Sequence, residues 1–449
     1  MSNHFSYPID HLRELAENVL HIARARGATE CAVEVSEGSG LSVNVRRGKV
    51  ETIEQNQDKG VGLTCYLGKK KGHASTSDFS LKALEDTVQA ALDIARFTSP
   101  DEFSGLPEDE FFERQPLDLK LYKPWDISAD DAIAFAKRAE DAAFAVDPAI
   151  RNSDGASVSV QHAQFISANS RGFMGGYPHS RHYLTVAPIA RVGREMERDD
   201  WYTASRDPKK LALPEVVGEY AARRALSRIG ARKISTRKCP VLFEAPLAGG
   251  LLGSFVQAIS GGALYRRTTF LADSLGAQVF PSHINLSEDP HIKGAMGSAP
   301  FDEEGVRTQR RDVVRDGIVQ GYFLSTYSAR KLGMRTTGNA GGSHNLVLSS
   351  THTKRGDDFE QMLRKLGTGL LVTDLMGQGV NYVTGDYSRG AAGHWVENGK
   401  IVHPVGEITI AGNLRQMFEN IVAIGADRIS RGTKTTGSIL IGEMVIAGS

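Results

Sequence analysis

The stretch Gly385–Leu414, GDYSRGAAGHWVENGKIVHPVGEITIAGNL, decides the fold of the carboxy-terminal half of the chain. Its centre, Asn398-Gly399, is the favoured pair for a two-residue type I′ turn, because both central positions of that turn need a positive φ angle. The turn predicts an antiparallel hairpin and fixes its register. In that register His394 faces His403 on one side of the hairpin.

This pair of histidines raises the hypothesis of a metal site, since neutral imidazole is a common ligand of transition metals. A stable zinc site normally needs three protein ligands, and the sequence around the hairpin offers no third. The simpler interpretation is two histidines packed across a hairpin. An autonomous metallohydrolase that uses His394 and His403 stays as an alternative.

Further strand signals surround this hairpin. Glycine contributes 47 of the 449 residues, against a usual share of about 7%, and it lies in segments that alternate apolar and polar residues. Asp316-Gly317 predicts a second tight hairpin, with Val314 opposite Val319. Helices are expected only at about 246–260, 357–367 and 413–420. The carboxy-terminal part is therefore predicted to be strand-rich and barrel-like.

The amino-terminal half predicts two copies of one plan, in which a helix, an antiparallel meander and a second helix follow each other. The first copy has a helix at 10–26, a hairpin turning at Arg47-Gly48 and a helix starting at Ser80. The second has a helix from Ser128 to about Val146 and another after Pro214. The fold class is therefore α+β, with a two-layer α/β region before the barrel-like part. The predicted domains are 1–120, 121–234 and 235–449.

Composition limits the function classes. Lys and Arg together number 53, as do Asp and Glu, so no overall field attracts nucleic acid or anionic lipid. Three widely spaced cysteines argue against a disulfide framework and fit a reducing cytoplasm. No secretory signal is recognisable, and no apolar run approaches the ~20 residues that span a bilayer. We expect a cytoplasmic protein with no membrane partner.

Four segments carry a resemblance to a known family. They are Gly385–Leu414, GGALYRRTTFLADSLG from Gly261 to Gly276, FDEEGVRTQRRDVVRDGIVQGYFLSTYSARKLG from Phe301 to Gly333, and TGNAGGSHN from Thr337 to Asn345. In this order they resemble the PmbA/TldE half of the TldD/PmbA family. The resemblance implies a subunit of a cytoplasmic, heterodimeric zinc metalloprotease that degrades or processes unfolded peptides.

One departure from the family pattern matters most. The family's catalytic members carry HExxxH upstream of the segment matching Arg266-Arg267, and a late cysteine as third zinc ligand. Here the corresponding positions hold Gly253, Ser254 and Ala258, and Thr436 stands near the position of the cysteine. The resemblance therefore implies no catalytic residue and no metal in this chain. Zinc is expected in a TldD-like partner, and this chain is expected to help build the substrate channel.

Candidate residues for substrate or partner binding come from two segments. Arg266 and Arg267 suit bidentate contacts to carboxylates, either at a subunit interface or at a peptide terminus. The segment GDYSRG is expected to hold Asp386 and Arg389 as a local ion pair that stiffens the loop. The candidate set is Arg266, Arg267, Asp386, Tyr387, Ser388, Arg389 and His394.

A basic run supports one further alternative. Seven cations lie between Glu219 and Glu244 without an acidic residue among them, namely Arg223, Arg224, Arg228, Arg232, Lys233, Arg237 and Lys238. Such a run is typical of a nucleic-acid footprint, which would make the chain a non-enzymatic modulator that binds nucleic acid or a nucleic-acid enzyme. Without a recognised binding module, a solvated face or a contact to an acidic partner is the preferred interpretation.

Overall fold

The amino-terminal half contains two helix–meander–helix units, as predicted, in a computed structural model that describes residues 4–448. The first unit consists of α1 (Ile9–Ala25), β1 (Glu30–Arg46), β2 (Lys49–Leu67), β3 (Lys70–Thr76) and α2 (Leu81–Phe97). The second consists of α3 (Ala129–Val146), β4 (Ile150–Asn169), β5 (Met174–Val192), β6 (Glu195–Arg198), β7 (Trp201–Ser205) and α4 (Pro214–Ser227). Two 3₁₀ turns, Asp109–Phe111 and Pro208–Lys210, lie in the connections.

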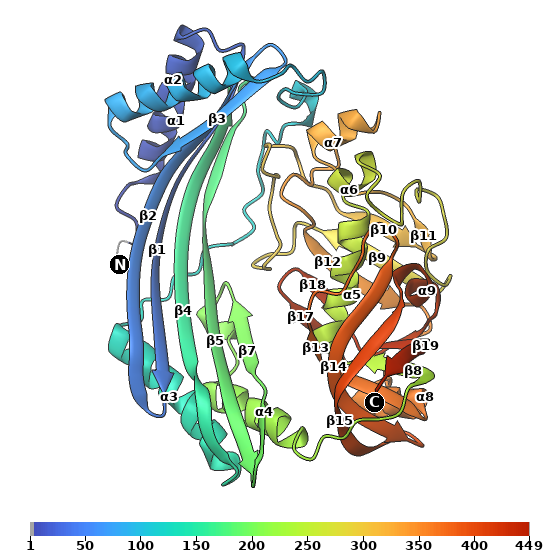
Figure 1. Ribbon diagram of the computed structural model, residues 1–449. Coiled ribbons are helices and arrows are strands. Elements are labelled where there is room, and N and C mark those ends of the chain that lie inside the picture. The colour runs from blue at the N-terminus through green and yellow to red at the C-terminus, as the bar shows by residue number, and fades with distance from the viewer. Residues whose placement is uncertain (1–3, 449) are drawn as a thin grey trace.

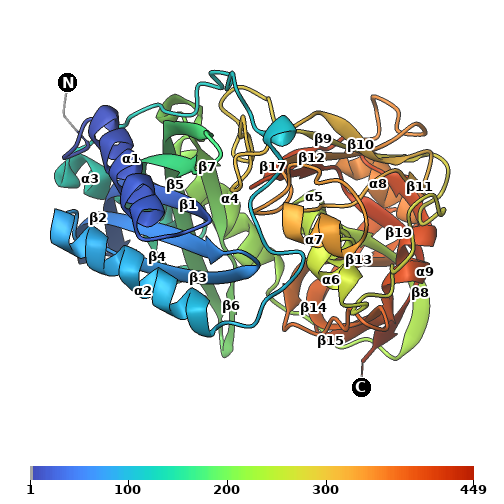
Figure 2. The same ribbon diagram turned by 90° about the horizontal axis from the view of Figure 1, so that it is seen from above.

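The two units share one sheet. Antiparallel pairing of β1 with β4 joins the meanders into a seven-stranded sheet of order β3-β2-β1-β4-β5-β6, with β7 also paired to β5. Residues Val33 and Val35 of β1 belong to one apolar cluster with α1 and α2, whereas Val43 and Val45 belong to another with α3 and α4. Because side chains alternate along a strand, the opposite face of the sheet carries Glu34 and the other residues that alternate with these valines. That face curves toward the carboxy-terminal region (Figures 1 and 2).

Local signals place these elements where the sequence predicts them. The hairpin between β1 and β2 turns at Arg47-Gly48, whose φ angles of 51° and 69° suit a type I′ turn. The Ser80 side chain accepts a hydrogen bond at the start of α2, and Ser128 accepts one from the Asp131 N–H at the start of α3. These hydroxyls satisfy N–H groups that have no partner within the helix.

The carboxy-terminal region contains a barrel and a second sheet. Its elements are β8 (Arg237–Phe243), α5 (Ala245–Ala258), α6 (Gly261–Tyr265), β9 (Ile284–Asp289), β10 (Arg311–Arg315), β11 (Ile318–Val319), α7 (Thr326–Lys331), β12 (Asn345–Ser350), α8 (Phe359–Leu366), β13 (Gly369–Met376), β14 (Asp386–Glu397), β15 (Lys400–Asn413), α9 (Leu414–Glu419), β16 (Ile421–Ile424), β17 (Ile429–Arg431), β18 (Lys434–Thr436) and β19 (Ile439–Ala447). The short helices α6 and α7 were not predicted.

The barrel closes through the strand that starts the region and the strand that ends the chain. In the order β15-β14-β13-β8-β19, β19 pairs back with β15, so the ring of five strands has no free edge. The second sheet has the order β11-β10-β9-β12-β18-β17. One apolar core joins the two, and Phe243, Phe255 and Leu271 are fully buried in it. The predicted barrel-like architecture is confirmed.

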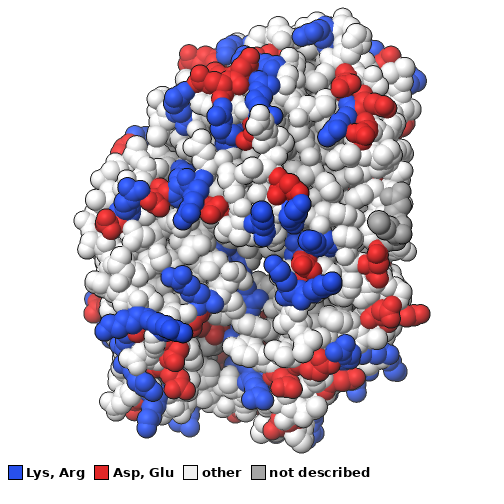
Figure 3. Space-filling model, turned by 180° about the vertical axis from the view of Figure 1, so that it is seen from behind, with Lys and Arg blue, Asp and Glu red and all other residues white. Residues whose placement is uncertain are grey.

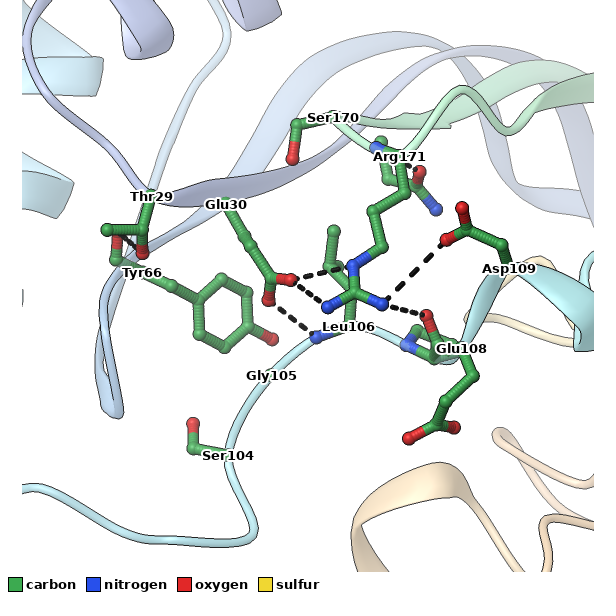
Figure 4. A network of polar contacts seen from close by, with 12 residues as sticks. Thr29, Glu30, Tyr66, Ser104, Gly105, Leu106, Glu108, Asp109, Ser170 and Arg171 are labelled. Atoms are coloured by element: carbon green, nitrogen blue, oxygen red, sulfur yellow. Dashed lines mark hydrogen bonds and ion pairs between the residues drawn. The ribbon is translucent and has the colours of Figure 1, made fainter.

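A long irregular segment between α2 and α3 spans the two regions (Figure 4). The Glu30 carboxylate accepts from the Leu106 N–H at 3.0 Å and from Arg171 Nε at 2.7 Å. From the opposite side, Arg330 on α7 donates to the carbonyls of Phe103 (3.2 Å) and Leu106 (2.6 Å). This segment is therefore docked on both regions. None of the helices in residues 4–448 combines the length and apolar character needed to cross a bilayer.

Candidate functional site

Helix α5 presents small residues toward β18. A Cβ atom built on Gly253 would lie 3.6 Å from Cε of Lys434, and one built on Gly249 would lie 3.8 Å from its Cβ. The Lys434 side chain therefore lies along the part of α5 where the resemblance places a histidine ligand. Burial lowers the pKa of Lys434.

These residues do not fit a zinc ion. Gly253 and Ala258 have no ligating side-chain atom, and the Ser254 hydroxyl donates to a carbonyl of its own helix at 3.3 Å. Thr436 is 1% exposed, and its hydroxyl donates to the next carbonyl at 3.1 Å. An ammonium group beside the helix further disfavours a dication there. Across residues 4–448, no three or more His, Cys, Asp or Glu side chains are arranged to hold a metal.

The predicted facing of His394 and His403 is wrong. Close to the turn the register is as expected, but Val402 forms a β-bulge, so Trp395 lies opposite His403 and His394 lies opposite Pro404. Directly opposed residues point to the same face, and neighbours along a strand point to opposite faces. One extra residue therefore places the two imidazoles on different faces of the hairpin.

His394 has a structural contact instead. Its Nε2 lies 3.0 Å from the carbonyl oxygen of Ser227, the last residue of α4. Burial lowers the pKa of His394, so the neutral ring is favoured in the fold. The contact connects the barrel to the second amino-terminal unit. It gives no support to a two-histidine metal site.

The expected ion pair between Asp386 and Arg389 is also absent from the contacts of residues 4–448. The Asp386 carboxylate accepts from the Thr384 hydroxyl at 2.7 Å and from the Asn413 amide at 3.3 Å. Arg389 donates to the Leu375 carbonyl at 3.4 Å. Both residues lie on β14 with an odd spacing, and the alternation of a strand directs them to opposite faces.

The remaining members of the candidate set differ in exposure. Tyr387 is 3% exposed, and burial raises its pKa to about 12, whereas Ser388 lies exposed beside it. Arg266 and Arg267 are exposed after α6; Arg266 donates to the Tyr265 hydroxyl at 2.9 Å, and Arg267 pairs with Asp273 at 2.6 Å.

The structure brings only part of this set together. The Phe270 N–H, just after the arginines, donates to the Tyr382 carbonyl at 2.8 Å, so the turn after α6 lies beside the loop before β14. His394 is eight residues along β14 from Asp386, which corresponds to about 26 Å. The turn that follows the two arginines therefore lies beside the segment before β14, and His394 lies far along β14 from that segment.

Two arginines of the basic run join the two regions of the molecule. Arg224 on α4 donates to both carboxylate oxygens of Glu244, at 2.8 and 3.0 Å, and to Asp199 at 3.2 Å. Arg228 pairs with Asp374 at 2.8 Å. These two arginines are paired within the fold, whereas the other five cations of the run are exposed, as the interpretation of a solvated face expects. On the face seen in Figure 3, positive and negative side chains are interspersed.

Sequence reasoning missed a cavity of about 420 Å³ between the open face of the amino-terminal sheet and loops of the carboxy-terminal region. Its walls include Glu34 on β1, Arg181 on β5, and Glu303 and the glycine-rich residues 340–344 from the other region. Only residues 337–345 carried a signal, their glycine content, because the other walls come from distant parts of the sequence.

Fold and site together define a class of protein: an open, helix-backed sheet faces a closed barrel, with charged and aromatic side chains between them. Family models described as PmbA/TldA metallopeptidase domain 1, central domain and C-terminal domain match residues 31–95, 122–229 and 236–448. The chain belongs to the PmbA/TldD metallopeptidase family.

Individual relatives agree with this assignment. The chain is 48% identical to the Metalloprotease PmbA of Escherichia coli O157:H7, over 97% of this chain and 96% of that protein. It is 45% identical to the PmbA homolog of Haemophilus influenzae, over 98% and 96%. A solved Bacteroides thetaiotaomicron protein, described as a candidate modulator of DNA gyrase, superposes with a TM-score of 0.92 at 27% identity, covering 98% of this chain and 99% of that one.

The fold is shared with a protein named TldE. TldE from Thermococcus kodakarensis superposes with a TM-score of 0.84 at 21% identity, over 97% of this chain and all of that one. A TldD homolog of Haemophilus influenzae is 24% identical over 81% of this chain and 78% of that protein. The family therefore contains both kinds of chain.

Proposed function

We propose that this chain is the PmbA/TldE-type subunit of a heterodimeric TldD–TldE zinc metalloprotease that degrades or processes unfolded peptides. A TldD-like subunit carries the zinc. This chain contributes the substrate channel and the assembly surface. The observation that carries the proposal is the filling of the expected metal position by Gly253, Ser254, Ala258 and the Lys434 side chain.

The chemistry explains why a partner is needed. A zinc peptidase uses the ion to lower the pKa of a bound water to about 7 and to polarise the scissile carbonyl. Neither effect is available from glycine, alanine or a hydrogen-bonded hydroxyl. An extended peptide can still add to a sheet edge through main-chain hydrogen bonds, with little preference for sequence. The curved sheet and the strand-rich second region suit that mode of binding.

The experiment is a three-way comparison of this chain alone, a TldD-like chain alone and their mixture. Peptidase rate and zinc content are measured for each sample. We expect chelator-sensitive activity only in the mixture, and substoichiometric zinc in this chain alone. Full activity of the TldD-like chain by itself, unchanged by this chain, contradicts the proposal.

Variants separate this proposal from the autonomous hydrolase. Replacing His394 and His403 by alanine is expected to leave the zinc content of the complex unchanged. Reversing the charges of Arg266 and Arg267 to glutamate is expected to weaken assembly or peptide turnover, because these exposed cations lie on the proposed partner surface. One tightly bound zinc per isolated chain, lost in the histidine variant, favours the hydrolase instead.

A further inference from the structure

The cavity between the two regions has three layers, which the strand register defines. Glu34, Ser167 and Gly175 lie in one row across β1, β4 and β5. The next row holds Phe165 and Tyr177. Side chains two residues apart on a strand share a face, so these rows face the cavity together with further rows along β5.

One end of the cavity is acidic. Glu34 lies in the first row, and Glu303 comes from the opposite region. Neither carboxylate has a hydrogen bond or an ion pair within residues 4–448. Burial raises the pKa of Glu34, and the charge of Glu303 raises it further. The two carboxylates therefore repel each other, and a bound cation would relieve that repulsion.

The position of Glu303 is fixed by its neighbour Asp302. The buried Asp302 carboxylate accepts from the N–H groups of Glu304 and Val306, both at 2.9 Å, and from that of Ala340 at 3.0 Å. These bonds tie the loop that carries Glu303 to the glycine-rich wall. The acidic end is thus a built feature of two segments far apart in the sequence.

The middle of the cavity is aromatic. The ring centroids of Phe165 and Tyr177 are 4.8 Å apart, and Phe301 from the other region lies 5.7 Å from Tyr177. A Cβ atom on Gly175 would come within 2.9 Å of the Phe301 ring, so a larger residue here would displace that ring. Such a layer suits an apolar group between two charged ones.

The other end is basic. Arg206 is 4% exposed, and its guanidinium donates to the carbonyls of Ser180, Ala295 and Met296. Neither Arg206 nor Arg181, which also lines the cavity, has a carboxylate partner within residues 4–448. Burial lowers the pKa of Arg206 to about 10, and the nearby charge of Arg181 acts in the same direction. An anion would offset both positive charges.

The ring of His179 adds no third charge to this end. Burial, together with Arg206 and Arg181, lowers the pKa of His179 to about 4. The imidazole is therefore neutral near pH 7. Charge at this end rests on the two arginines alone.

We propose that this cavity binds a short, free peptide by its two ends, with the α-ammonium group between Glu34 and Glu303, an apolar side chain against Phe165 and Tyr177, and the terminal carboxylate at Arg181 and Arg206. The inference rests on the proposed function in one respect, because it takes peptides as the ligand. It assigns to this chain a step that a channel subunit can perform without metal: holding a fragment by its termini.

The length of the ligand follows from the register. The rows of Glu34 and Arg181 are six residues apart along β5, from Gly175 to Arg181, or about 20 Å. The long side chains of both rows reach toward the cavity and shorten the distance to be spanned. An extended peptide covers about 3.3–3.6 Å per residue, so ligands of three to five residues fit and a dipeptide is too short.

The test uses the purified full chain, without partner or zinc, and isothermal titration calorimetry. The probes are Ala-Leu-Ala and Ala-Leu-Leu-Ala, each free, N-acetylated or C-amidated. The free peptides should bind more tightly than the capped ones, since each cap removes the charge that would pair with the exposed Glu34 and Glu303 or with the exposed Arg181 and the buried Arg206. The dipeptide Ala-Leu should bind more weakly than both.

Two variants connect each cap to its end of the cavity. Glu34→Gln should reduce the penalty of acetylation to less than twofold and leave that of amidation intact, whereas Arg181→Gln should do the reverse. The matched controls are Glu54→Gln on β2 and Arg191→Gln on β5, which lie outside the cavity and should bind as the unaltered chain does.

Each result decides the inference. Equal binding of free and capped peptides, absence of binding at millimolar peptide, or unchanged cap penalties in both variants overturns it. Thermal melting checks folding, and Glu34→Gln should melt no lower than the parent, because the substitution removes a repulsion with Glu303. Peptidase assays are not used, so failure here is distinguishable from failure of the heterodimer proposal: end-specific binding with an inactive mixture refutes only the latter.

Discussion

Removing Arg224 should loosen the attachment of the barrel region to the amino-terminal sheet. The side chains of Arg224, Glu244 and Asp199 are only 12%, 9% and 10% exposed. Arg224→Met keeps much of the side-chain volume but leaves the Glu244 carboxylate buried without its bidentate partner. Breaking a buried pair in this way costs about 3–5 kcal/mol of unfolding free energy.

The matched control is the preceding residue. Arg223 is 71% exposed and lies 3.7 Å from Glu219 one helical turn away. An exposed pair of this kind contributes only about 0.3–0.5 kcal/mol, so Arg223→Met should be nearly neutral. Urea unfolding of both variants, followed by circular dichroism and by tryptophan fluorescence, measures the difference; one of the three tryptophans, Trp201, has its ring 5.4 Å from Arg224.

The pH dependence gives a second readout. Burial raises the pKa of Glu244, and Arg224 opposes that rise. Without the arginine the folded-state pKa should rise further. A carboxyl group whose pKa is raised in the folded state stabilises the folded protein at low pH, and this contribution to the unfolding free energy is lost as pH rises through the folded-state pKa. The deficit of Arg224→Met should therefore be smaller at pH 5 than at pH 8, and adding Glu244→Gln should recover part of it.

The reasoning is refuted if Arg224→Met costs less than about 1 kcal/mol, or no more than Arg223→Met, since a buried pair cannot then be holding the two regions together. A deficit that does not change with pH contradicts the role assigned to Glu244. A deficit that Glu244→Gln does not reduce indicates lost packing against Trp201 in place of lost charge.

Three further variants test the fold. Gly399→Val forces a β-branched residue to a φ of 73° and towards the Arg364 backbone. The variant should lose about 1–3 kcal/mol of unfolding free energy, measured by thermal or urea unfolding. An unchanged unfolding midpoint contradicts the turn assignment. Gly72→Ala puts a Cβ 2.0 Å from the Ala91 carbonyl oxygen. The variant should lose about 1–3 kcal/mol or more of unfolding free energy, and stability equal to that of the unaltered protein would contradict this close approach. Burial lowers the pKa of His162 to about 4. Its neutral ring therefore stabilises the fold above pH 6.5, and about 3 kcal/mol of unfolding free energy is lost as pH falls to 4. His162→Phe should remove that part of the acid sensitivity, and parallel pH profiles of stability for the variant and the unaltered protein would contradict this role of His162.

The sequence by itself determined the features that depend on a few neighbouring residues. The turns at Arg47-Gly48 and Asn398-Gly399 could be predicted because a type I′ turn needs positive φ at both central positions, and glycine adopts that conformation at low cost. The caps at Ser80 and Ser128 could be predicted because a hydroxyl satisfies an N–H group within three residues. Repeated patterns of this kind were enough for the helix–meander–helix units and for a strand-rich second region.

The features that sequence reasoning missed are either very short or depend on cross-strand geometry. Helices α6 and α7 have five and six residues, which is too few for a helical period of apolar residues to stand out. The bulge at Val402 inserts one residue between positions whose alternation looks regular in the sequence. That single residue reversed the predicted facing of His394 and His403.

Only the tertiary structure decided what the charged residues do. Arg224 and Arg228 read as a basic run along the chain, yet the fold places Glu244 and Asp374 against them. The cavity between the two regions joins Glu34 to Glu303 and to residues 340–344, through the pairing of β1 with β4 and the docking of the second region. Sequence patterns report the hydrophobic period and the local φ preference of a segment. The partner of a charged side chain is set by long-range packing, and residues close in the sequence carry no signal for that packing.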